Sequence, residues 1–166
     1  KQNKEIRCRK NLVIFRFKSK FLKKYHIQKY NSEFNNLWNE FVAKSKNATF
    51  LFHRDFMEYH QDRFEDYSLL IFDETQKLQA VFPANRVETV LYSHQGLTYG
   101  GLVFERNHNP IFTSKMVDSL LLFLKKEAFT EVNIKIIPTI YNKSNTQEFD
   151  CYLYKIGAEL LNREMN

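Results

Sequence analysis

The sequence is poor in cysteine, proline and glycine, and it has no long hydrophobic run. Cys8 and Cys151 are its two cysteines, too few for a disulfide framework, so we expect a reducing compartment and a cytoplasmic location. No stretch reaches the roughly 20 apolar residues of a transmembrane helix. Near the N-terminus, the apolar run 12–15 is too short for the core of a signal peptide.

Glycine is scarce and unevenly placed. Three of the four glycines, Gly96, Gly100 and Gly101, fall within six residues. Hydrophobic residues make up 43% of the chain and aromatic residues 16%, which excludes disordered and collagen-like classes. A chain of 166 residues is long enough for one domain with a continuous core.

The formal charge of +6 is confined to one end of the chain. Residues 1–30 hold eleven of the 25 Lys and Arg but one of the 19 Asp and Glu, a charge of +10, which leaves −4 for the rest. We therefore predict a basic arm over 1–24, poorly ordered, and one domain over 25–166. The alternative is an arm that contacts anionic lipid or RNA.

Hydrophobic periodicity predicts an α+β (α/β) protein. Period-two runs predict strands, and apolar stripes at i, i+3, i+4 and i+7 predict helices. We expect Ser32 to cap the first helix and Asn109 with Pro110 to open the third. The expected strands are 25–30, 67–72, 77–82, 87–93, 97–104, 131–137 and 158–161, and the expected helices are about 34–45, 55–64, 110–126 and 146–156. This order predicts one mixed, mostly antiparallel central sheet with helices on both faces.

The same order of elements is that of the GNAT acetyltransferase fold. Residues 47–104 resemble the bacterial FemAB-like branch of that superfamily, most clearly in TFLFHRDFMEY (49–59), DRF (62–64) and SHQGLTYGGL (93–102). The resemblance implies an N-acyltransferase without a metal. Its donor would be acyl-CoA such as acetyl-CoA, or aminoacyl-tRNA, and its acceptor the amine of an amino-sugar or another cell-envelope or surface-polysaccharide precursor.

Two features qualify this expectation. Relatives of this kind usually contain two GNAT-like halves, so we expect this chain to be the first half, to need a second GNAT-like half, and to be weakly active alone. The GNAT pyrophosphate signature requires glycine three residues after Gln or Arg, whereas Thr98 follows Gln95 at that spacing.

The segment 93–101 is the strongest candidate site. Acyl transfer needs a proton acceptor, groups that stabilise the developing oxyanion, and a backbone edge that holds the donor. We predict His94 as the base and Tyr99 as the proton donor to the leaving group. The predicted binding residues here are Ser93, Gln95, Gly96, Thr98, Gly100 and Gly101. The structural alternative is a turn at 94–96 followed by a bulge or a close backbone approach at the paired glycines.

A second candidate is the pair His53 and Arg54, which we predict to line the substrate site. The alternative is a helix start capped by Asp55 with solvated histidines. The histidine spacing does not match a zinc site, and we predict no metal.

Two other functions remain open. One is a non-catalytic GNAT-like module that binds a partner or its missing half, as the incomplete pyrophosphate signature suggests. The other is RNA binding through the basic arm, with tRNA as the one expected nucleic-acid partner.

Overall fold

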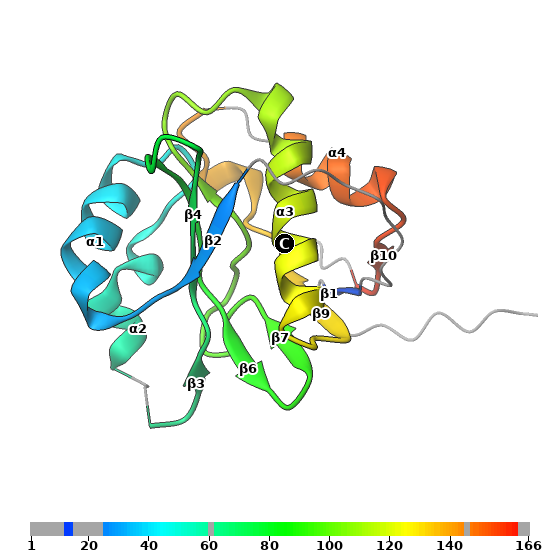
Figure 1. The fold of residues 1–166 in the computed structure, drawn as a ribbon, viewed down its shortest axis with the longest axis horizontal. Helices are drawn as coiled ribbons and strands as arrows, with labels where there is room; N and C mark the ends of the chain where they lie inside the picture. Colours follow the sequence, from blue (N-terminus) through cyan, green and yellow to red (C-terminus); the bar gives the residue numbers. More distant parts are fainter. Residues whose placement is uncertain (1–11, 15–24, 60–61, 145–146, 163–166) are drawn as a thin grey trace, which may run out of the picture.

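The computed structural model describes residues 12–14, 25–59, 62–144 and 147–162, without the side chains of 12–14. These residues form an α+β fold, as the sequence predicts (Figure 1). The helices are α1 (Asn35–Lys44), α2 (Arg54–Glu58), α3 (Thr113–Lys126) and α4 (Glu148–Lys155). The strands are β1 (Leu12–Ile14), β2 (His26–Lys29), β3 (Glu65–Asp66), β4 (Leu69–Phe72), β5 (Leu78–Phe82), β6 (Asn85–Val87), β7 (Val90–Tyr92), β8 (Val103–Phe104), β9 (Glu131–Lys135) and β10 (Glu159–Leu160).

The strands form two sheets, so the prediction of one central sheet is wrong. The first sheet has the order β10-β1-β9-β7-β6-β3 and the second the order β2-β4-β5-β8. Every pair of neighbouring strands described here is antiparallel except β7 and β9. A single parallel bridge between Gly100 and Ile136 lies between the two sheets, just before the chain enters β8. The sheets separate because β8 pairs with β5 and β9 pairs with β7.

Two predicted strands differ from the observed ones in a way that matters for the site. The predicted strand 87–93 is the second half of a hairpin, β6–β7, whose first strand begins at Asn85. The predicted strand 97–104 is reduced to the Gly100 bridge and the short strand β8. The predicted helix 55–64 also ends early, since α2 stops at Glu58.

Helix ends follow local chemistry, with one correction. Asn31, rather than Ser32, caps the short 3-10 helix that leads into α1. Asn109 caps the turn before α3, as predicted. After α4, Gly157 has φ +81 and its N–H bonds to the carbonyl of Tyr154, which is the geometry expected of a glycine at the end of a helix.

The second sheet is buried on both faces, as the expectation of helices on both faces requires. Leu69 and Ile71 of β4 pack into a core with α3, α4 and strands β7 and β9. Leu70 and Phe72 face the opposite way, into a core with α1 and α2. Figure 1 shows α1 and α2 on one side of β2 and β4, with α3 on the other.

Some expectations fall partly outside the described residues. Three residues of the predicted arm, 12–14, form β1 between β9 and β10, and the remainder of 1–24 lies outside the description. Within the described part of the chain, no helix combines the length and the apolar character needed to cross a bilayer.

Candidate functional site

The segment 93–101 is a loop that begins and ends beside β9. Ser93 donates its N–H to the carbonyl of Asn133 (2.8 Å), and its Oγ accepts from the N–H of Lys135 (2.8 Å). Gly100 then donates its N–H to the carbonyl of Lys135 (2.6 Å). Both ends of the loop are therefore fixed to β9, at Asn133 and Lys135.

Gly100 is required by this closed loop. A Cβ added at Gly100 would overlap the carbonyl oxygen of Ser93 and lie 3.0 Å from its Oγ. Gly101 has φ +102, a region that residues with a side chain rarely adopt. The predicted close backbone approach at the paired glycines is confirmed, and the chain turns there from one sheet to the other.

Inside the loop, the predicted binding residues mostly hold the loop itself. The Gln95 N–H donates to Oδ1 of Asn85 (2.7 Å), and the Asn85 amide donates to Oε1 of Gln95 (2.9 Å). A Cβ at Gly96 would collide with the ring of Phe64. His94 has φ +63, is buried, and packs its ring edge-to-face on Phe64 with centroids 5.5 Å apart. The predicted turn at 94–96 is confirmed by the bond from the Leu97 N–H to the His94 carbonyl.

Tyr99 has different neighbours from His94. Its ring stacks on Tyr141 with centroids 5.1 Å apart and meets Phe52 edge-on. Its hydroxyl donates to Oγ1 of Thr49 (3.3 Å). The two predicted catalytic side chains share none of these contacts, and Thr98 between them is exposed.

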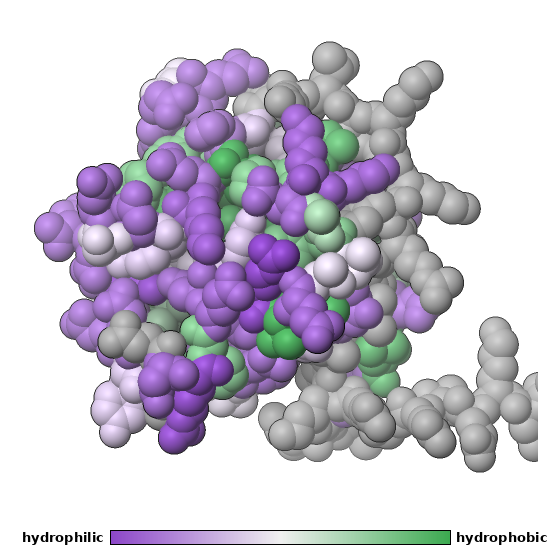
Figure 2. Space-filling model, turned by 60° about the horizontal axis from the view of Figure 1, so that its bottom comes forward, coloured by the Kyte–Doolittle hydropathy of each residue, from purple (hydrophilic) through white to green (hydrophobic). Residues whose placement is uncertain are grey.

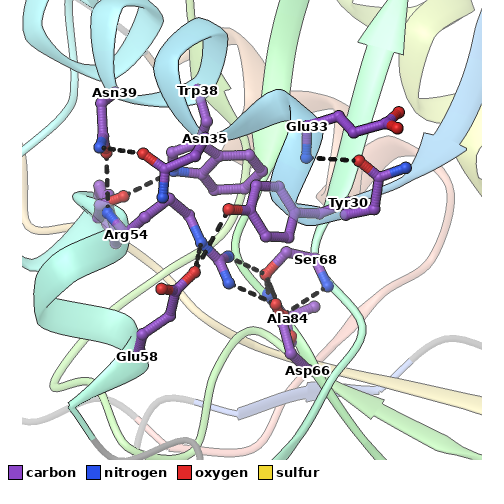
Figure 3. Close-up of polar contacts among 12 residues, drawn as sticks. Tyr30, Glu33, Asn35, Trp38, Asn39, Arg54, Glu58, Asp66, Ser68 and Ala84 are labelled. Atoms are coloured by element: carbon purple, nitrogen blue, oxygen red, sulfur yellow. Dashed lines mark hydrogen bonds and ion pairs between the residues drawn. The ribbon is translucent and has the colours of Figure 1, made fainter.

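Arg54 is the centre of a satisfied ionic cluster at the start of α2 (Figure 3). The guanidinium donates to Asp66 (2.5 Å), to Glu58 (3.1 Å) and to Ser68 (3.3 Å). It also lies over the Tyr30 ring, 3.6 Å from the centroid. All three guanidinium nitrogens have partners within the protein, which indicates a structural role.

The start of α2 corrects one alternative from the sequence. His53 occupies the position before the helix, makes no capping hydrogen bond with its side chain, and is half-buried. Asp55 lies in the first turn of the helix rather than at its cap. Instead, Oδ1 of Asn39 accepts the backbone N–H of Arg54 (2.8 Å).

A small cavity lies where β8 and β9 separate, beside Gly100. Its volume is about 20 Å³, enough for one water-sized group. Asn47 holds the side of the cavity formed by β8 and the residue before it. The Asn47 amide donates to the Leu102 carbonyl and accepts the Phe104 N–H, both at 2.8 Å. The lining residues are Asn47, Gly100, Leu102, Ile136, Ile137, Asn142, Phe149 and Asp150.

Asp150 is the ionisable residue that lines this cavity, and it is influenced by the charge of Glu148, which also acts on His108. Burial, with a smaller contribution from Glu148, raises the pKa of Asp150 to about 6. Buried Lys46 pairs with Glu148 (2.5 Å). Burial lowers the pKa of His108 to about 4, and the charge of Lys46 adds to that effect. A carboxylate that titrates near pH 6 beside a cavity is suited to accept a proton at neutral pH.

Sequence reasoning missed Asp150, Asn142, Asn47 and Lys46. Asp150 precedes Cys151 in an ordinary amphipathic helix, and the other three lie in segments read as helix ends and loops. Only the packing of α4 against the end of β9 reveals them, since no spacing in the sequence links 46–47 to 142–150.

A metal centre has no support in the described residues, where no group of three or more His, Cys, Asp or Glu side chains is arranged to hold an ion. In comparisons with known proteins, no family model matches the chain and no curated protein matches it significantly. The class of the protein therefore rests on its α+β fold and the site just described.

Proposed function

We propose that this chain is an N-acyltransferase of the GNAT-like type, acting where β8 and β9 separate. One observation carries the proposal. The parallel partner of β9 is β7, and just past β9 the parallel partner is Gly100; the chain then leaves this sheet, because β8 pairs with β5. Parallel strands that part in this way leave a gap in which a ligand has access to backbone groups. The resemblance of residues 47–104 to the FemAB-like branch points to the same chemistry.

In the proposed reaction, the acceptor amine attacks the acyl carbonyl of the donor directly. The amine N–H proton passes to Asp150, the new C–N bond forms, and the bond to the thiolate of CoA or the ribose oxygen of tRNA breaks. Asp150 replaces His94 as our candidate base because it lines the cavity, whereas His94 packs on Phe64. Tyr99 remains the proposed proton donor to the leaving group.

The donor is acetyl-CoA or aminoacyl-tRNA, and the acceptor is an amino-sugar or another cell-envelope precursor. We place the reaction in the cytoplasm, where both donors are made. A second GNAT-like half is part of this proposal, and it predicts slow turnover by the chain alone.

The test is a combined binding and turnover assay on the full chain. We expect acetyl-CoA or aminoacyl-tRNA to bind, and product to form slowly with glucosamine. Asp150→Asn should lower turnover by roughly 100-fold, the contribution of a general base. Asp55→Asn, at an exposed carboxylate on α2, should leave turnover unchanged. If neither donor binds, the proposal is wrong; fast turnover would instead overturn the need for a second half.

A non-catalytic interaction module is the second candidate, and one observation favours it. Ile140 is 82% exposed and its neighbour Tyr141 is 46% exposed, beside Tyr99 of the candidate segment. The face seen in Figure 2 is largely hydrophilic, with hydrophobic areas between the polar side chains. Sedimentation should then show association that depends on concentration and is lost in Ile140→Glu. An entirely monomeric wild-type chain would count against self-association through this patch.

A further inference from the structure

The second sheet ends at β2, whose outer side is open. Among the described strands, β2 pairs with β4 alone. Just after β2, the Tyr30 N–H donates to the Ser68 carbonyl (2.8 Å), which makes these two residues a hydrogen-bonded pair. Such pairs alternate with non-bonded pairs along an antiparallel ladder, so the N–H and C=O groups of Ile27 and Lys29 point away from β4. Backbone groups that face outward from an edge strand form a template for another strand.

A cavity of about 240 Å³, called here the β2 cavity, lies beside this open edge. Residues 25–27 line it from the β2 side, and Ser119, Leu122, Phe123 and Lys126 line it from α3, which runs beside β2 in Figure 1. Most of the lining is apolar. An apolar cavity of about 150 Å³ can hold benzene, so the β2 cavity has room for a Leu or Phe side chain.

One extended segment would reach both the open edge and the β2 cavity. The Ile27 side chain packs into the core that contains α3, so residues 25, 27 and 29 share the α3 face of β2. A strand added to β2 would lie about 4.8 Å away, with every second side chain on that same face. Those side chains would point toward the β2 cavity while the backbone pairs with Ile27 and Lys29. A lipid or a small apolar molecule would fill the cavity but leave these backbone groups unpaired.

Charge around the β2 cavity also selects a ligand. The basic side chains of His26 and Lys126 line the cavity, and none of the described Asp and Glu residues does. Carboxylates lie beyond one end of it, since burial, followed by the charges of Asp73 and Glu74, raises the pKa of Tyr25. We therefore expect acidic residues of the ligand beside the cavity and not beyond Tyr25.

We propose that β2 binds an extended peptide segment of a partner protein by strand addition, with a Leu or Phe side chain in the β2 cavity and acidic residues close to it. Backbone hydrogen bonds to Ile27 and Lys29 supply affinity, and the cavity supplies specificity. β2 and β8 form opposite edges of the second sheet, so this site is separate from the cavity beside Gly100. The inference does not depend on the proposed acyl transfer.

The test combines a peptide screen with hydrogen exchange on the full chain. The probe is a library of blocked peptides of about six residues, a typical strand length, that alternate Val, Leu or Phe with Thr, Asp or Glu. Fluorescence polarisation should show binding of acidic members that contain Leu or Phe, with a Kd below about 1 mM. With the tightest binder present, the amide protons of Ile27 and Lys29 should exchange at least about tenfold more slowly, whereas that of Gln28, which faces β4, should be unchanged.

Matched changes in the peptide and in the protein isolate the backbone bonds. Methylation of the peptide nitrogens that face β2 should abolish binding, and methylation of the alternate nitrogens should leave it intact. Lys29→Pro removes one outward N–H and should weaken binding about fivefold relative to Lys29→Ala, the value of one backbone hydrogen bond. Leu122→Glu, in the cavity lining, should abolish binding, while Ile140→Glu, at an exposed apolar residue elsewhere, should leave it unchanged.

Several results would overturn strand addition at β2. One is that no library member binds, and another is that the two methylated peptides bind equally. A third is slow exchange of the Ile27 and Lys29 amides in the chain alone, which would mean that another part of this chain or a second copy already covers the edge. Decanoate that binds more tightly than every peptide, without slowing these amides, would also overturn the proposal, in favour of a lipid site.

Discussion

Two clusters of this protein bury a positive charge, and they differ in how completely it is satisfied. Arg54 is 2% exposed and has partners for every guanidinium nitrogen, from Glu58, Asp66 and Ser68. Lys46 is 3% exposed, pairs with Glu148, and lies over the Phe104 ring, 5.6 Å from its centroid. Next to that pair, Asp150 keeps a raised pKa and Asn142 an unpartnered oxygen among the described residues.

The difference separates a structural cluster from a candidate site. Arg54 joins α2 to β3 and to Ser68, just before β4, through bonds made within the protein that occupy every guanidinium nitrogen (Figure 3). The second cluster, called here the cavity cluster, consists of Lys46, Glu148, Asp150, Asn142 and the nearby His108. Its Lys46–Glu148 pair joins the segment after α1 to α4, but the side-chain oxygens of Asn142 and Asp150 remain beside the cavity next to Gly100. Unsatisfied polar groups are costly, so they are expected where a ligand completes them.

The largest effect should come from breaking the Arg54 cluster. Arg54→Met keeps much of the side-chain volume but leaves Asp66 and Glu58 without their cation. Removing one partner of a buried pair costs about 3–5 kcal/mol, and the partly exposed carboxylates place the expected loss near 3 kcal/mol. Urea denaturation measures it. Lys44→Met, in the exposed pair with Glu40, should cost less than about 0.5 kcal/mol.

Gly100→Ala should cost nearly as much. Its Cβ would overlap the Ser93 carbonyl at the neck of the loop, and overpacking of this kind costs about 1–3 kcal/mol or more. Gly157→Ala is the matched control, because its Cβ meets nothing within 4 Å but its φ of +81 is unfavourable. We expect Gly157→Ala to cost about 1 kcal/mol in urea denaturation. Equal losses of stability in Gly100→Ala and Gly157→Ala would show that the backbone around Gly100 shifts to make room for the added Cβ.

Lys46→Met should destabilise by about 2–3 kcal/mol, because it leaves Glu148 in a largely buried position without its cation. The double variant Lys46→Met, Glu148→Gln should recover part of that loss, since it removes both charges. Thermal unfolding of the two single variants and the double variant provides the cycle. Additive losses would mean that the pair is not coupled, which would weaken the contrast with Arg54.

The cavity cluster should also give two opposite pH dependences. The raised pKa of Asp150, about 6 against 3.8, means that the folded state binds its proton more tightly, so stability falls as the pH rises from about 4 to 6. The lowered pKa of His108, about 4 against 6.5, makes stability rise over nearly the same range. The slopes of the unfolding free energy should largely cancel in the wild type.

Single variants should expose each slope. Asp150→Asn should leave a stability that rises with pH between about 4 and 6.5, and His108→Gln one that falls between about 4 and 6. Neither slope should exceed about 1.4 kcal/mol per pH unit, the value for one proton. Identical pH profiles in the two variants would refute the assignment of these groups.

Apart from the control variants, the smallest effect on stability should come from Tyr99→Phe. It removes one 3.3 Å hydrogen bond to Thr49 and keeps the stacking on Tyr141, so we expect a loss of about 0.5–1 kcal/mol. If Tyr99 donates a proton to the leaving group, the turnover rate should fall far more than stability does. Unchanged turnover would limit Tyr99 to packing.

Several elements of the fold were predictable from local pattern. The apolar run in β4 and the stripes of α1, α3 and α4 place these segments correctly, because burial imposes a period on each kind of element. Asn109 and Gly157 mark helix ends through bonds within a few residues. The division into two sheets was missed because it depends on whether β8 pairs with β5 or with β9, which no local pattern encodes.

The candidate site was predicted only in part. Gly100 and Gly101 stood out in a glycine-poor sequence, and the structure gives the reason in the close approach of Ser93 and the change of sheet. Arg54 was expected to line a substrate site, yet its partners lie within the protein. Its role depends on Asp66 and Ser68, twelve and fourteen residues away.

The sequence by itself determined the α+β class, most helices and strands, and the positions where the backbone needs glycine, because these depend on burial period and on contacts between near neighbours. Only the tertiary structure decided which polar groups are satisfied. Lys46 meets Glu148 across 102 residues, and Asp150 reaches the end of β9 through the packing of α4. The balance of desolvation and pairing that shifts a pKa depends on such distant contacts, so it appears only in the folded chain.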